Sequence, residues 1–114
     1  MKTELLDELR ILCARLPVPQ PEWHPHVPEI RAFRADFERA LALAAERPAA
    51  LTLAAELLDA ETEPELAEGA APELAAAWRR LEELPPPGGQ HPFLDEIAPA
   101  LEAVRILLAA LSRG

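Results

Sequence analysis

The sequence predicts an all-α fold, a compact bundle of about five helices with two proline-rich connections. Half of its residues are hydrophobic although only 4% are aromatic, and the strong helix formers alanine (23 residues) and leucine (20 residues) supply most of that content. Isoleucine, valine and threonine together number only ten, too few for a sheet protein. Because 114 residues is the size of one domain, we expect residues 1–114 to form a single α-helical domain.

The first expected helix spans about residues 4–16, with Thr3 as its N-cap and Pro17 as its stop. Its apolar stripe recurs at spacings of three and four: Leu5, Leu9, Leu12, Cys13 and Leu16. An extended linker follows at about residues 17–28, where five prolines in twelve residues exclude a helix. Stretched at ~3.1 Å per residue, this linker could return along the first helix and make the first two helices parallel. Looped out, it would keep them antiparallel.

Two further helices are expected at about residues 28–46 and 49–60, separated at Pro48. The earlier of the two would bury Ile30, Phe33, Phe37, Leu41 and Ala44. Its exposed turns would carry two ion pairs, Arg34 with Glu38 and Asp36 with Arg39. The later one is apolar nearly all round, which indicates a central position or half of an oligomer interface. We therefore predict a homodimer that forms through this helix or through the last one.

A capping box, Thr62-Glu63-Pro64-Glu65, predicts a short helix at residues 63–68 that ends at Gly69. A longer helix then runs from Pro72 to Leu84 and buries one face, made of Leu74, Ala77, Trp78, Leu81 and Leu84. The second connection is a Pro/Gly loop at about residues 85–92.

The last helix has the clearest period in the chain: Leu94, Ile97, Leu101, Val104, Leu108 and Leu111. Pro99 leaves two possibilities for its start. We favour Asp95 as the N-cap, which puts Pro99 in the first turn of a helix from about 96 to 112, after a short turn at 92–95. A helix that starts at Pro92 would instead kink near Pro99. The larger core residues are expected to be Phe33, Phe37, Trp78 and Phe93.

Several chemistries are excluded by the residues that are present. Ser112 is the only serine, which excludes a Ser-His-Asp hydrolase, and the four glycines form neither a phosphate-binding loop nor a dinucleotide fingerprint. Cys13 is the only cysteine, so an intrachain disulfide and a cysteine-based zinc cluster are excluded. We expect no catalytic residues and no cofactor.

The net charge of −9 opposes binding to nucleic acid and to anionic membrane surfaces, which both need a basic footprint. The apolar stretches are interrupted by charges, so they resemble neither a signal sequence nor a membrane span. A lone cysteine is typical of a reducing compartment, and we expect a cytoplasmic protein. Ten arginines to one lysine and the scarcity of amide residues are typical of thermostable proteins from bacteria with GC-rich genomes.

The three histidines are the candidate metal ligands. His24 and His26 flank Pro25, and His91 lies four residues before Asp95, so the histidines with one carboxylate could hold Zn²⁺ or another divalent metal. In the alternative interpretation, the neighbouring Trp23 packs on the bundle and fixes the linker. The histidines then lie in solvent. His26, which precedes Glu29, acts as an imperfect cap of the second helix, and His91 does the same near the last helix.

Six acidic residues fall within residues 56–68 without a basic one: Glu56, Asp59, Glu61, Glu63, Glu65 and Glu68. A calcium loop fails, because Pro64 and Ala70 occupy the positions that need glycine and glutamate. Glu65-x-x-Glu68 resembles half of the paired acidic motif of helical nucleotide pyrophosphatases, but the second half is not recognisable. Two interpretations of the acidic run remain: a solvated corner of the surface, or a docking surface for a basic partner. The arginines at 31, 34, 79 and 80 could bind an acidic ligand or pair with neighbouring acids.

By elimination, the sequence predicts a small acidic protein–protein interaction module or adaptor, with a protein partner or self-association. The alternative is a metal- or small-ligand-binding helical protein that uses His24, His26 and His91. A third possibility, an inhibitor that imitates nucleic acid, is weakened by the eleven basic residues mixed among the acids.

Overall fold

The computed structural model describes residues 2–23, 25–61, 63–84 and 92–113. These ranges hold five α-helices and one short 3₁₀ helix: α1 (Lys2–Ala14), η1 (Pro21–Trp23), α2 (Val27–Glu46), α3 (Pro48–Ala60), α4 (Pro72–Glu83) and α5 (Pro92–Arg113). The described residues contain no strand, so the prediction of an all-α bundle is confirmed. None of these helices combines the length and the hydropathy that crossing a bilayer requires.

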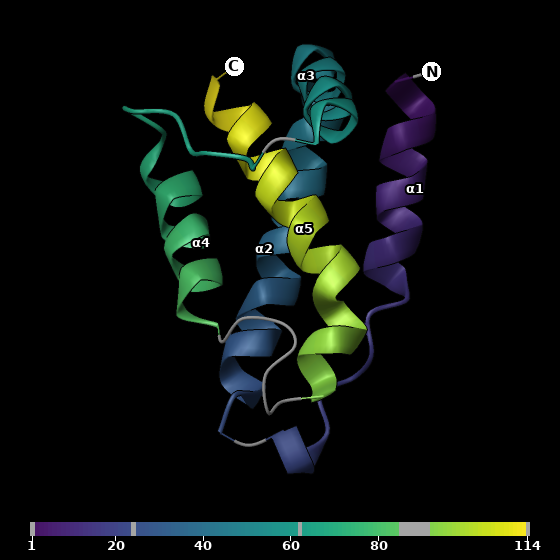
Figure 1. Cartoon of the computed structure of the whole chain (residues 1–114), viewed down its shortest axis with the longest axis vertical. Coiled ribbons are helices and arrows are strands. Elements are labelled where there is room, and N and C mark those ends of the chain that lie inside the picture. The colour runs from purple at the N-terminus through teal and green to yellow at the C-terminus, as the bar shows by residue number, and fades with distance from the viewer. Residues whose placement is uncertain (1, 24, 62, 85–91, 114) are drawn as a thin grey trace.

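The helices α1 and α4 run in one direction along the bundle, and α2 and α5 run in the other, while α3 packs at the end where both termini lie (Figure 1). Of the two linker alternatives, the structure therefore has the looped one, with α1 and α2 antiparallel. The linker is fixed to the bundle by Trp23, which is buried and stacks on Phe93 with ring centroids 5.3 Å apart.

The core is built around α5, which contacts each of the other four α-helices. Its predicted stripe lies against these helices, and its most deeply buried large side chains are Leu94, Ile97, Val104, Leu107, Leu108 and Leu111. The apolar face of α5 is thus already covered within one chain. The apolar surface of α3 is covered only in part, because Leu51 is buried whereas Leu58 is 42% exposed. Among the described side chains of the two helices considered for a dimer, the exposed large apolar one is Leu58 of α3.

Two helix starts differ from the sequence prediction. The first helix begins at Lys2, which places Thr3 inside it, so the N-cap assigned to Thr3 is wrong. The last helix begins at Pro92 and contains Asp95 and Pro99, so the preferred start after Asp95 is wrong and the alternative start at Pro92 is right. Burial explains the longer helix, because starting at Pro92 brings Phe93 and Leu94 into the core.

The short helix expected at residues 63–68 does not form, and residues 63–67 have no regular secondary structure. This segment must cross from the end of α3 to the start of α4, on the other side of α5 (Figure 1). An extended chain covers ~3.3 Å per residue whereas a helix covers only ~1.5 Å, so the crossing favours the extended form. Thr62, which would cap the helix, lies outside the described residues.

The ion pairs of α2 were predicted only in part. Arg34 pairs with Glu38 as expected, with Nε 3.7 Å from Oε1. Asp36 was assigned to Arg39 on an exposed turn, but it is buried and bonds instead to Arg80 of α4. The i,i+3 spacing gave no sign of this partner, which lies 44 positions away in the sequence.

Candidate functional site

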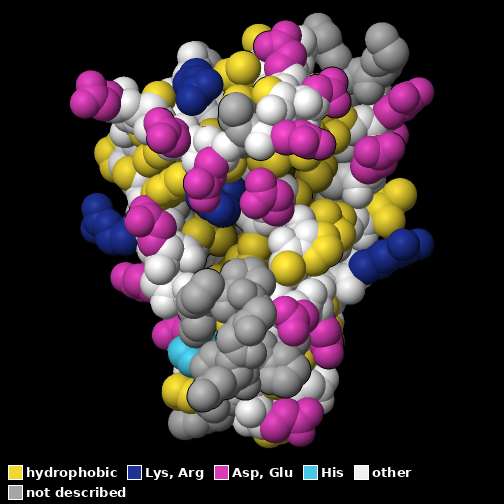
Figure 2. All heavy atoms as spheres, in the orientation of Figure 1, with side chains coloured by type: hydrophobic (Ala, Val, Ile, Leu, Met, Phe, Trp, Pro, Cys, Tyr) yellow, Lys and Arg dark blue, Asp and Glu magenta, His cyan; other side chains and the backbone are white. Residues whose placement is uncertain are grey.

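A groove of about 430 Å³ lies between α3, the following acidic segment and α5. Its floor and rim come from seven side chains: Leu57, Leu58, Glu61, Glu63, Glu102, Arg105 and Ile106. We call it the α3/α5 groove. On the face shown in Figure 2, acidic side chains outnumber basic ones over the upper half, where α3 and the end of α5 lie, and apolar surface shows between them.

The rim of the groove is fixed by bonds from α5 to the crossing segment. The Ser112 Oγ accepts a 2.9 Å hydrogen bond from the Ala67 backbone N–H and donates one of 2.7 Å to the Ala109 carbonyl. Arg105 Nη2 donates a 3.5 Å hydrogen bond to Glu63 Oε1. At the end of α3, Glu61 adopts a left-handed backbone conformation (φ 54°) that turns the chain out of the helix. The acidic rim is therefore held on two elements rather than on a free loop.

Arg105 is the basic side chain of the groove, and its charge is already balanced. Its guanidinium lies 3.5 Å from Glu63 and 3.9 Å from Glu102, and it stands over the Trp78 ring at 5.6 Å from the centroid. Glu61, on the same rim, has no ion pair among the described residues. The groove thus combines an apolar floor with a rim of net negative charge.

The histidine site cannot be assembled from the described residues. His26 is the N-cap residue of α2, with its Nδ1 2.7 Å from Glu29 Oε2 and its ring 5.9 Å from that of Phe93. It is therefore half-buried rather than in solvent, although it lies at the expected cap position. His24 and His91 lie outside the described residues, and within them no group of three potential ligands converges. The metal site stays a prediction.

Cys13 is buried in the core, as the stripe of the first helix predicts. Burial raises the pKa of its thiol above the ordinary value of 9.0, with a smaller contribution from the Glu38 carboxylate, while Arg34 acts in the opposite direction. A buried thiol that keeps its proton is a poor nucleophile. The interpretation of Cys13 as a buried core residue is confirmed.

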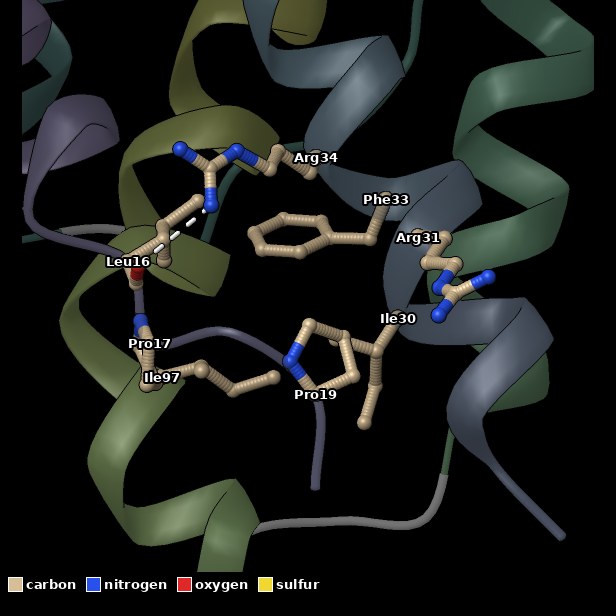
Figure 3. A pocket seen from close by; sticks show the side chains of 8 residues that line it. All are labelled: Leu16, Pro17, Pro19, Ile30, Arg31, Phe33, Arg34 and Ile97. Carbon is tan, nitrogen blue, oxygen red and sulfur yellow. Dashed lines mark hydrogen bonds between the residues drawn. The ribbon is translucent and has the colours of Figure 1, made fainter. Parts of the chain in front are cut away.

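The structure also shows where the acidic half-motif and the arginines singled out in the sequence lie. Glu65 and Glu68 lie in a non-helical segment, so the half-motif of helical nucleotide pyrophosphatases does not form. Arg80 bonds to the buried Asp36, so it is not open to an acidic ligand in the way that an unpaired arginine is. Arg31 and Arg34 instead line a small apolar pocket beside the proline-rich linker (Figure 3).

The α3/α5 groove was only partly visible in the sequence. The acidic run from 56 to 68 and the all-round apolar character of the helix before it were both recognisable. The contribution of α5 was not, because Glu102, Arg105 and Ile106 meet the acidic run only through tertiary packing.

Comparison of the chain with protein-family models, with curated proteins and with solved structures finds no match in any of the three.

Proposed function

We propose that this protein is a protein-interaction module without catalytic chemistry of its own, and that it binds a basic amphipathic segment of a partner protein in the α3/α5 groove. The observation that carries this proposal is the apolar floor made by the exposed Leu58 and the half-buried Leu57 beneath a rim of three glutamates. An apolar helix face with lysine or arginine beside it would meet both features at once.

Charge complementarity selects a basic partner. Arg105 is engaged by Glu63 and Glu102, so the rim keeps a negative field, and the whole chain carries −9. A field of this sign speeds the approach of a basic segment and disfavours an acidic one. The groove volume of about 430 Å³ falls within the size of ordinary binding pockets, which supports the docking of a few side chains.

A second copy of the chain is the competing occupant, because the sequence predicts a homodimer through α3 or α5 and Leu58 of α3 is exposed. An isologous contact would bring Leu58 of both copies together, but it would also set the glutamates of one rim near those of the other. This repulsion makes a basic partner the better complement. Light scattering at micromolar concentration distinguishes the two, since the basic-partner proposal expects the mass of one chain.

The test uses a labelled synthetic helix with leucines on one face and lysines on the other, followed by fluorescence anisotropy. We expect a dissociation constant on the order of 10 μM at low salt, weakening as salt screens the rim. Leu58→Asp should weaken binding by roughly tenfold. The matched control is Ile11→Asp, because Ile11 is 51% exposed on α1 and takes no part in the groove. If Leu58→Asp and Ile11→Asp lose affinity for the peptide equally, the groove is not the binding site.

A second pair of variants separates the rim from the overall charge. Glu61→Gln with Glu102→Gln removes two charges from the groove, whereas Glu82→Gln with Glu83→Gln removes two from exposed positions of α4. If the rim recognises the peptide, the first pair should weaken binding several times more than the second. Equal effects would mean that only the net charge attracts the peptide, and the proposal would be wrong.

A further inference from the structure

A second pocket lies where the proline-rich linker passes α2 and α5, away from the α3/α5 groove (Figure 3). Pro17 and Pro19 form its outer side, and Ile30, Phe33 and Ile97 form its floor. The three floor residues are almost fully buried. The space within it is only about 20 Å³ and its lining is nearly all apolar. Small apolar cavities hold water poorly, so the end of an aliphatic chain suits this space better than a water molecule does.

Two arginines of α2 flank the apolar floor. In Figure 3 the guanidiniums of Arg31 and Arg34 stand on opposite sides of Phe33. Arg31 is exposed, and none of the ion pairs or hydrogen bonds found among the described residues involves it. Arg34 makes only long contacts, 3.4 Å to the Leu16 carbonyl and 3.7 Å to Glu38. Positive charge thus lies beside an apolar pocket in a chain whose net charge is −9.

We propose that this linker pocket binds a short aliphatic carboxylate, with the alkyl end on Phe33 and Ile97 and the carboxylate on Arg31. The planar guanidinium of arginine matches a carboxylate in a bidentate geometry, and Arg31 has no competing acid among the described residues. The small volume limits the buried part of the ligand to about one or two carbons, so the rest lies at the mouth beside Pro19. Longer fatty acids do not fit.

The proposal does not depend on the α3/α5 groove, and its test uses different residues and a different probe. Sodium 3-methylbutanoate is titrated into the full chain while amide and methyl NMR signals are recorded, with sodium chloride matching the ionic strength. We expect shifts concentrated at Leu16, Ile30, Phe33 and Ile97, with a dissociation constant on the order of 1 mM. Absence of shifts at these residues at millimolar ligand would overturn the proposal.

Two controls separate recognition from general attraction. Arg31→Met should raise the dissociation constant by roughly tenfold, whereas Arg39→Met, an exposed arginine further along α2, should leave it unchanged. The neutral analogue 3-methylbutan-1-ol tests the charge, and acetate tests the alkyl group; both should bind much more weakly. Unchanged affinity in Arg31→Met, or equal binding of the alcohol, would show that the pocket does not recognise a carboxylate.

Discussion

Asp36 on α2 and Arg80 on α4 form a bidentate pair, in which Arg80 Nε donates a 2.7 Å hydrogen bond to Asp36 Oδ2 and Arg80 Nη2 donates one of 2.7 Å to Asp36 Oδ1. The two side chains differ in burial, since Asp36 is 6% exposed and Arg80 40%. The hydrogen bond to Asp36 raises the pKa of Arg80 above its ordinary value, because it stabilises the charged form of the guanidinium. This pair fixes α4 against α2 by charge as well as by apolar contact.

The unequal burial predicts unequal effects of removing each partner. Arg80→Met leaves a buried carboxylate without its cation and should lower the free energy of unfolding by about 3–4 kcal/mol. Asp36→Asn leaves a guanidinium that can hydrate, and should lower it by about 1–2 kcal/mol. Urea unfolding followed by circular dichroism measures both, with the exposed Arg79→Met as the control, expected within about 0.5 kcal/mol of the parent. Equal losses in the two variants would contradict the asymmetry.

Pro99 lies inside α5, seven residues after the helix starts at Pro92, and has no N–H to donate to the helix. Pro99→Ala should therefore raise the free energy of unfolding by about 1–2 kcal/mol, after allowance for the greater freedom of the unfolded chain. Thermal unfolding provides the measurement. Pro72→Ala, at the first position of α4, should give no such gain. A Pro99→Ala variant no more stable than the parent would indicate a helix that begins after Asp95.

Ser112 connects α5 to the crossing segment through the Ala67 N–H. Ser112→Ala should speed hydrogen exchange at the Ala67 amide, with a loss of about 1 kcal/mol in local stability. Thr52→Ala is the matched control, because the Thr52 hydroxyl bonds to the Pro48 carbonyl within α3. Exchange at Ala67 that is unaffected by Ser112→Ala would mean that the segment is held by other contacts.

The buried Cys13 predicts a loss of stability in alkali. Because burial raises the pKa of its thiol above 9.0, the folded chain holds the proton at a pH where the unfolded chain has released it. The contribution of the protonated thiol to the free energy of unfolding is therefore fully present below about pH 9, and it is lost as the pH rises above that value. The chain has one lysine and no tyrosine, so few other groups titrate in this range.

The measurement is the free energy of unfolding between pH 8 and pH 10, compared with that of Cys13→Ala. The variant should be less stable by a constant amount at lower pH, from its lost packing, but its stability should fall less steeply in alkali. Parallel pH profiles for the two proteins would contradict a protonated, buried thiol.

The helices and the buried stripe of α5 follow from the sequence because both depend on neighbours three and four positions away. Leu94 to Leu111 repeat at the period of one helix turn, so any packing that buries one of them buries the others. Pro48 and Pro72 likewise begin helices for a local reason, since a proline in the first turn loses no hydrogen bond. These features need no knowledge of the rest of the chain.

Tertiary packing alone decided the partners of the charged and irregular parts. Asp36 had a plausible local partner in Arg39, yet it bonds to Arg80, and residues 63–67, which were expected to be helical, have no regular secondary structure. The groove formed by Leu58 with Ile106, and the pocket beside Arg31, also join elements far apart in the sequence. Helix periodicity is a property of the local backbone, whereas these contacts depend on how whole helices are placed, which no spacing in the sequence records.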